Sequence, residues 1–211
     1  MEFKGTIIEW LCHACFKIKT GNNTIYTDPF NIKENEKASI VLVTHEHFDH
    51  CSPEDIAKIA SPETIIVCNS LAAQKLSKWK TVPLKAGQSF EAKEVKIFAV
   101  PSYNVSKPFH PKGIGTGFVF ETGKVRFYIA GDTDFIPEMN SLKGKVDVAF
   151  LPVDGTYTMS AEDAVKAVQA INPEIAIPMH YGGDAGNGTI ENAKLFAKLC
   201  GKKAVLLEKN Q

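Results

Sequence analysis

The chain has 211 residues, of which 44% are hydrophobic and 23% charged, as in an ordinary globular protein with a substantial core. Its 24 basic and 24 acidic residues balance, and Arg126 is the one arginine, so we expect neither nucleic acid nor a membrane as a partner. Residues 1–5 lack the apolar stretch of a signal peptide, no apolar run is long enough to span a bilayer, and the five cysteines are an odd number. We therefore expect reduced thiols in the cytoplasm.

The first third of the chain is dominated by strand patterns. Alternation or apolar runs predict strands over residues 6–10, 16–19, 24–27 and 39–43. The last of these is continuously apolar, which is typical of a strand buried on both faces. Ser52 and Pro53 then begin a helix, as N-cap and first helical residue.

Strands and helices alternate through the rest of the chain. We predict strands over 64–68, 96–100, 117–121, 125–130, 146–151, 175–179 and 204–207, with helices over 71–79, from Ser160 and over 190–199. A long loop spans residues 101–117, and loops of that length in a folded domain are usually functional or disordered. The order of elements predicts one domain over residues 1–211, an α/β (α+β) fold in which two sheets form a four-layer αββα sandwich.

Three histidines and an aspartate directly follow the strand over 39–43, in the order His45, His47, Asp49 and His50. Imidazole and carboxylate groups are common transition-metal ligands, so this spacing predicts a metal site with one or two ions. Asp132 and His180 also come directly after predicted strands. Because such strand ends meet along one edge of a layered fold, we expect all of these side chains to converge.

These motifs resemble those of the metallo-β-lactamase fold superfamily. The motifs that carry the resemblance are His-x-His-x-Asp-His at 45–50, Gly-Asp-Thr-Asp at 131–134 and Met-His-Tyr-Gly at 179–182. Within the superfamily the chain is most similar to small metal-dependent hydrolases related to L-ascorbate-6-phosphate lactonase, which share Trp-Leu-x-His, here at 10–13, and Asp-Pro-Phe, here at 28–30.

The resemblance implies two divalent metal ions, with zinc favoured and manganese or iron as alternatives. It places His45 and His47 on the first ion. It places Asp49, His50 and His180 on the second, with Asp132 bridging the two. Asp49 and Asp132 would then be the catalytic carboxylates of a hydrolase whose nucleophile is a metal-bound hydroxide bridging the ions.

One position departs from the superfamily pattern. The third histidine of the first metal usually follows the strand that here ends near Val100, but this chain has Ser102, Tyr103 and Asn104 there. We hypothesise that His110 folds back as the missing ligand, with Asn104 either a weak ligand or a residue behind the ligands.

Four other residues have less certain roles. His13 is expected in the core or behind the ligands rather than as a ligand, because it lies between strand residues. Asp28 either holds His13 or a ligand imidazole, or simply ends a strand. Tyr181 and Tyr157 are candidates for substrate contact, as are two lysines, Lys107 and Lys112.

The function implied is hydrolysis of a small ester, lactone or phosphoester, with a small molecule as the only expected partner and the oligomeric state open. One alternative is a phosphodiesterase or nuclease of the same fold, which the neutral charge disfavours. Another is a redox di-iron protein or a non-catalytic metal-binding protein. Redox relatives usually carry glutamate where this chain has His47, which favours hydrolysis.

Overall fold

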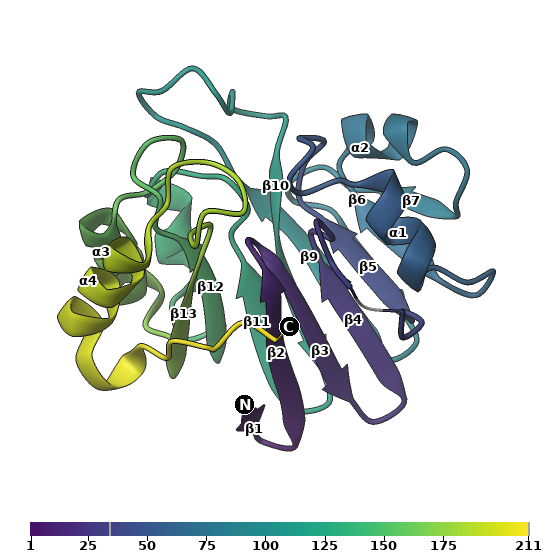
Figure 1. The fold of residues 1–211 in the computed structure, drawn as a ribbon, viewed down its shortest axis with the longest axis horizontal. Helices are drawn as coiled ribbons and strands as arrows, with labels where there is room; N and C mark the ends of the chain where they lie inside the picture. Colours follow the sequence, from purple (N-terminus) through teal and green to yellow (C-terminus); the bar gives the residue numbers. More distant parts are fainter. Residues whose placement is uncertain (34, 211) are drawn as a thin grey trace.

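Two β-sheets lie face to face in the computed structural model, which describes residues 1–33 and 35–210 (Figure 1). The first sheet contains, from edge to edge, β1 (Glu2–Phe3), β2 (Thr6–Cys12), β3 (Cys15–Thr20), β4 (Asn23–Thr27), β5 (Ile40–Val43), β6 (Ile65–Cys68) and β7 (Thr81–Pro83). The second contains β13 (Ile175–Met179), β12 (Val148–Pro152), β11 (Val125–Ile129), β10 (Thr116–Thr122), β9 (Val95–Pro101) and β8 (Ser89–Ala92).

Each sheet is antiparallel in one half and parallel in the other. In the first sheet, β1 to β4 pair antiparallel and β4 to β7 pair parallel. In the second, β8 to β11 pair antiparallel and β11 to β13 pair parallel. The parallel strands require crossover connections, which bring their carboxyl ends to one edge of the sandwich.

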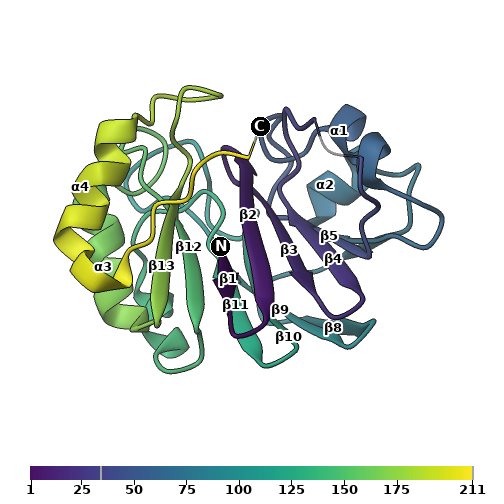
Figure 2. The same ribbon diagram turned by 60° about the horizontal axis from the view of Figure 1, so that its bottom comes forward.

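Helices cover the outer face of each sheet (Figures 1 and 2). The outer layers contain α1 (Pro53–Ile59) and α2 (Ser70–Lys75) on the first sheet, and α3 (Ala161–Ile171) and α4 (Ile190–Cys200) on the second. Short 3-10 helices cover Pro137–Leu142 (η1) and Gly201–Lys203 (η2). The predicted four-layer αββα fold class is confirmed.

Strand β5 shows why the layers form in this order. Ile40 and Leu42 face the second sheet, whereas Val41 and Val43 pack against α1 and α2. Side chains alternate across a strand, so an apolar run of this kind must be covered on both faces. Ser52 caps α1 as predicted, its hydroxyl accepting a hydrogen bond from the backbone N–H of Asp55 at 3.2 Å.

Three details differ from the sequence-based expectations. The predicted helix over 71–79 ends at Lys75. Strands β1 and β7, of two and three residues, are too short to show an alternation, and β8 lacks the continuous apolar run that marks β5 and β6, so none of the three was predicted. The predicted strand over 204–207 is wrong. Only Ala204 forms a bridge, with Ala176, and the segment then runs from β13 to β2, where Lys209 bridges Trp10 (Figure 2).

The helices of the structure can be compared with the length that a bilayer requires. Across residues 1–33 and 35–210, no helix has both the length and the apolarity needed to cross a bilayer.

Candidate metal centre

The side chains predicted to bind metal converge from both sheets. His13 lies in the tight turn between β2 and β3, and His45 to His50 follow β5. Asp132 follows β11 and His180 follows β13, both in the second sheet. His110 comes from the long loop between β9 and β10. The expected convergence at the strand ends is therefore what the structure shows.

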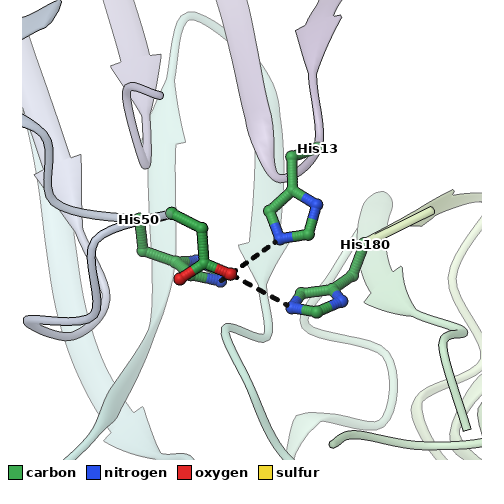
Figure 3. Close-up of side chains that lie close together, drawn as sticks. His13, His50 and His180 are labelled. Atoms are coloured by element: carbon green, nitrogen blue, oxygen red, sulfur yellow. Dashed lines mark ion pairs between the residues drawn. The ribbon is translucent and has the colours of Figure 1, made fainter. Parts of the chain in front are cut away.

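Four side chains form one group of possible metal ligands, namely His13, Asp49, His50 and His180, each offering one ligand atom within 4.8 Å of the others. The Oδ2 atom of Asp49 is 3.2 Å from His13 Nε2, 3.9 Å from His50 Nε2 and 4.0 Å from His180 Nε2. Figure 3 shows the three imidazole rings pointing toward one another from separate segments of the chain. The sequence predicts His13 in the core or behind the ligands. The structure instead places it among the candidate ligands.

A second group consists of His45, His47 and His110, again with ligand atoms within 4.8 Å of one another. The Nε2 atom of His110 lies 3.3 Å from His47 Nδ1. His110 thus folds back from its loop to lie beside His45 and His47. Asn104 lies behind it, since Asn104 Oδ1 accepts hydrogen bonds from both the backbone and the ring of His110.

Asp132 stands between the two groups. Its Oδ2 atom is 3.2 Å from His110 Nε2 and 3.1 Å from His180 Nε2, while its Oδ1 atom is 3.2 Å from His50 Nε2. The close approach of this segment to the first sheet depends on Gly131, which has a φ of +65° and where a Cβ atom would lie 2.9 Å from Thr44 Cβ. Asp132 is placed where one carboxylate could serve two ions.

Asp28 holds one of the candidate ligands in position. Its Oδ2 atom accepts a hydrogen bond from His50 Nδ1 at 2.9 Å, and both carboxylate oxygens also accept hydrogen bonds from Thr44. With Nδ1 donating to Asp28, it is Nε2 of His50 that faces the cluster and would offer its lone pair to a cation once its proton has left. Of the two roles left open for Asp28, the structure favours holding a ligand imidazole.

Asp154 lies beside another candidate ligand, His180, and was not anticipated from the sequence. Its Oδ1 atom accepts hydrogen bonds from the backbone N–H groups of Thr156, Tyr157 and Thr158, and its Oδ2 atom lies 3.8 Å from His180 Nδ1. The sequence contained a signal that could have identified Asp154, because this residue follows closely on strand β12 just as Asp132 follows β11.

Three residues of the cluster have left-handed backbone conformations, with φ angles of 49° at His13, 38° at Asp28 and 62° at His180. Such angles are uncommon for residues with a Cβ atom and cost on the order of 1–3 kcal/mol each. The surrounding fold enforces them, in part because the N–H of His180 donates a hydrogen bond to the carbonyl of His13 at 3.2 Å. Three of the eight non-glycine residues with positive φ in the described part of the chain thus belong to this cluster.

Unsatisfied polar atoms indicate that these residues fit a metal ion. Within the described residues, the buried side-chain nitrogen and oxygen atoms without a hydrogen-bond partner are Nδ1 and Nε2 of His13, Nε2 of His45 and His50, Nδ1 of His180, Oδ1 of Asp132, and one Oδ2 each of Asp154 and Asp184. Leaving such an atom unpaired costs about 1–3 kcal/mol. Coordination to cations would satisfy four of these eight atoms, namely Nε2 of His13, His45 and His50 and Oδ1 of Asp132. Imidazole with carboxylate is the donor set that zinc, manganese and iron accept.

Burial and neighbouring charges also prepare the side chains for metal. Burial lowers the pKa of His13 to about 4 and that of His45 well below its ordinary value, which keeps both imidazoles neutral. Burial also disfavours the charged forms of His50 and His180, but the Asp132 carboxylate outweighs it and raises both pKa values. Protons on these two rings must therefore leave when a cation binds.

Among the described residues, none of the cysteines belongs to a group of candidate ligands. Burial raises the pKa of the Cys12 thiol to about 12 and that of Cys51 to about 11, so both stay protonated near neutral pH. Cys12 and Cys15 are fully buried and all five cysteines are free.

A cavity of about 460 Å³ opens onto the cluster. Its lining residues are His47, Phe48, Asp49, Phe109, His110, Asp132, Tyr157, His180 and Gly186. Tyr157 is thus placed to contact substrate, whereas Tyr181 is 2% exposed and stacks on Trp10 with ring centroids 4.7 Å apart. The predicted substrate contact by Tyr181 is not supported, because this side chain faces the interior.

Comparison with known proteins relates this geometry to a family. The sequence signature of the "Beta-lactamase superfamily domain" matches residues 7–180. A UPF0173 metal-dependent hydrolase of Thermoplasma acidophilum is 34% identical over 188 residues, which are 82% of this chain and 82% of that protein. Another UPF0173 metal-dependent hydrolase, from Thermococcus kodakarensis, is 34% identical over 214 residues and covers 93% of each chain.

Solved structures agree with this relationship. The crystal structure of a candidate metal-dependent hydrolase of Parabacteroides distasonis has a TM-score of 0.83 and 35% identity, and the match covers 96% of this chain and 93% of that one. The chain therefore belongs to the β-lactamase superfamily, in the group of UPF0173 metal-dependent hydrolases. The resemblance to the superfamily is confirmed, while the narrower likeness to lactonases related to L-ascorbate-6-phosphate lactonase stays a prediction.

Proposed function

We propose that the protein hydrolyses a small ester, lactone or phosphoester with the help of two divalent metal ions, with zinc favoured over manganese or iron. The observation that carries the proposal is the position of Asp132 between two groups of candidate ligands, within 3.2 Å of histidines from each. A single-ion site would not require a carboxylate with this double set of contacts.

The ligand assignment follows the two groups. The first ion would be held by His45, His47 and His110, the second by His13, Asp49, His50 and His180, and Asp132 would serve both. This assignment adds His13 to the set implied by the family resemblance. It also proposes His110 as the replacement for the superfamily's third histidine.

When bound, the ions supply an activated water at neutral pH and polarise the carbonyl or phosphoryl oxygen of the substrate. Asp28 orients the imidazole of His50 through a hydrogen bond, the Asp154 carboxylate lies near His180, and the cavity places the substrate beside both rings. Burial alone would raise the pKa of Asp49, but a hydrogen bond with His13 and the charge of His50 lower it, so the carboxylate is ionised at neutral pH.

The bonds change in a simple order. The water oxygen bonds to the carbonyl carbon or phosphorus, and the bond to the leaving oxygen breaks. The proton of the attacking water passes to the Asp49 carboxylate and then to the leaving oxygen, which balances the reaction. Asp49 and Asp132 are the two carboxylates to which we assign catalytic roles.

The test is metal analysis combined with a substrate panel. The purified protein, reconstituted separately with zinc, manganese and iron, should bind two ions per chain and hydrolyse at least one class among lactones, simple esters and phosphodiesters. Asp132→Ala should bind at most one ion tightly and lose at least about 100-fold in kcat/KM. Asp163→Ala, at an aspartate of α3 whose side chain is 41% exposed, is the matched control and should retain both.

Other results would overturn the proposal. Redox-active iron with no hydrolytic turnover by any metal form would favour the di-iron alternative. CmlA, a diiron β-hydroxylase of Streptomyces venezuelae, has a similar fold at 15% sequence identity. At this identity the similarity concerns the fold and not the activity. Two ions bound at Asp132→Ala with wild-type affinity would remove Asp132 from its bridging role.

We also propose a cytoplasmic location. The support is the state of the cysteines: all five are free, and four of them are buried. Buried free thiols are stable in a reducing compartment, whereas an oxidising one favours disulfides.

A further inference from the structure

We infer that the substrate is uncharged away from its scissile bond and carries an aromatic group there. This inference rests on the proposed function, since it specifies the substrate of the same site. It concerns the part of the substrate that the cavity wall holds, not the group that the ions polarise.

Aromatic side chains form the wall of the cavity beside the candidate ligands. Phe48 is 67% exposed and Phe109 is 42% exposed, and both line the cavity together with the half-buried Tyr157. Most large aromatic residues are buried, so two exposed phenylalanines around one polar cluster indicate a surface that a ligand covers. Their rings offer faces and edges on which another aromatic ring packs favourably.

The aromatic wall is held in place before any ligand arrives. Phe109 packs edge to face on Tyr157, with ring centroids 4.8 Å apart, and Phe48 packs in the same way on Phe30 at 5.8 Å. The backbone N–H of Tyr157 donates to Asp154 Oδ1 at 2.7 Å, and its carbonyl accepts a hydrogen bond from Asn104 at 3.0 Å. A wall fixed in this way requires little ordering when the ligand binds.

The charges around the cavity exclude a second anionic group on the substrate. Among the described residues, no lysine or arginine lines this cavity. Lys107, in the same loop as His110, is paired with Asp134 at 2.9 Å, and Lys112 is paired with Glu138 at 3.0 Å. A remote phosphate or carboxylate would lose water without gaining a cationic partner, and burying such a charge is costly.

The test compares three lactones that share one reacting bond and differ at one carbon: γ-butyrolactone, its γ-phenyl derivative and its γ-carboxylate derivative. We expect kcat/KM for the phenyl compound to exceed that of the other two by at least about tenfold. If the reacting bond proves to be that of an ester or phosphodiester, the same three substituents are compared on that bond.

Variants connect the preference to the cavity wall. Tyr157→Ala should lower kcat/KM for the phenyl compound about five- to tenfold more than it lowers kcat/KM for γ-butyrolactone. Phe98→Ala is the matched control, because Phe98 is also about half exposed, at 47%, but lies on β9 outside this cavity. Metal content is measured for each variant, so that a change in substrate preference is separated from a loss of ions.

A binding measurement separates failure of this inference from failure of the proposed function. The lactam analogues, in which N–H replaces the ring oxygen, are titrated into the metal-loaded protein by calorimetry. Tighter binding of the phenyl lactam with no turnover of any substrate would reject hydrolysis and keep the aromatic site. Turnover with equal or better use of the carboxylate compound would reject the aromatic, uncharged substrate and keep hydrolysis.

Discussion

The Oδ1 atom of Asn104 accepts two hydrogen bonds from His110, one from its backbone N–H and one from its ring Nδ1, each at 3.0 Å. The amide orientation follows from its partners, since Asn104 Nδ2 donates to the carbonyl of Tyr157. Nδ1 of His110 therefore carries the proton, and Nε2 presents its lone pair toward His47 and Asp132. A residue six positions earlier thus fixes the ring that we propose as the replacement for the superfamily's third histidine.

Removing this acceptor should weaken the first metal site. We expect Asn104→Ala to lower the affinity for one of two ions about 10- to 100-fold, the usual effect of losing a residue that orients a ligand, while the other ion binds as before. Competition with a chromophoric chelator measures both affinities. Asn140→Ala, at an exposed asparagine of η1, is the control, and equal affinities in the two variants would contradict the role of Asn104.

Asp28 should matter for the second ion in the same way. Asp28→Asn keeps an oxygen for the backbone N–H of Thr44 but removes the charge beside His50 Nδ1. We expect about 10- to 100-fold weaker binding of one ion, with the far-UV circular dichroism spectrum unchanged. Retention of wild-type affinity would mean that Asp28 only ends strand β4.

The two ions should leave at different rates. His47 of the first group is exposed, whereas His13, His50 and His180 of the second group are at most 1% exposed. A chelator can approach an ion that has an exposed ligand without opening the fold, so we expect biphasic release on adding excess chelator. Stopped-flow absorbance follows the release, and a single phase that accounts for both ions would contradict the assignment.

Acid stability should depend on Asp55, away from the metal centre. Burial by itself would raise the pKa of this carboxyl, but hydrogen bonds from Lys58, Ser52 and the backbone of Asn31 and Ile32 lower it. A carboxyl with a lowered pKa stabilises the fold above its unfolded pKa near 3.9, and this stabilisation is lost as the pH falls through the folded pKa.

We therefore expect Asp55→Asn to lower the free energy of unfolding of the metal-free protein by about 1–2 kcal/mol at pH 7. The difference from wild type should shrink as the pH falls below about 4. Urea titrations over this range measure it. Asp163→Asn changes the corresponding position of α3, where the side chain is 41% exposed, and should cost less than about 0.5 kcal/mol.

Periodicity and spacing were sufficient to predict the layers and most of the cluster. The continuous apolar run Ile40 to Val43 must be covered on both faces of its strand, and it directly precedes the histidine motif. His110 could be proposed because it was one of two histidines not yet assigned. These inferences depend on residue type and order along the chain, which the sequence contains.

The position of His13 could not be predicted in this way. A register shift between Trp10 and Cys12 and the left-handed φ of His13 turn its ring toward the cluster, and neither follows from strand alternation. The substrate contact expected of Tyr181 was likewise not predictable from residue order. The chain turns after His180, and the ring of Tyr181 stacks on Trp10. The tail over 204–207 is apolar enough for a strand, but only one of its residues forms a bridge.

The left-handed backbone at His13 and His180 sets stability against function at two defined positions. Glycine adopts these φ angles without steric cost, so a glycine at either position would relieve strain and remove an imidazole together. Laboratory selection for thermal stability alone would favour glycine there, and the resulting proteins would fold yet bind metal poorly. Screens for more robust variants of this enzyme should therefore include metal content as well as melting temperature.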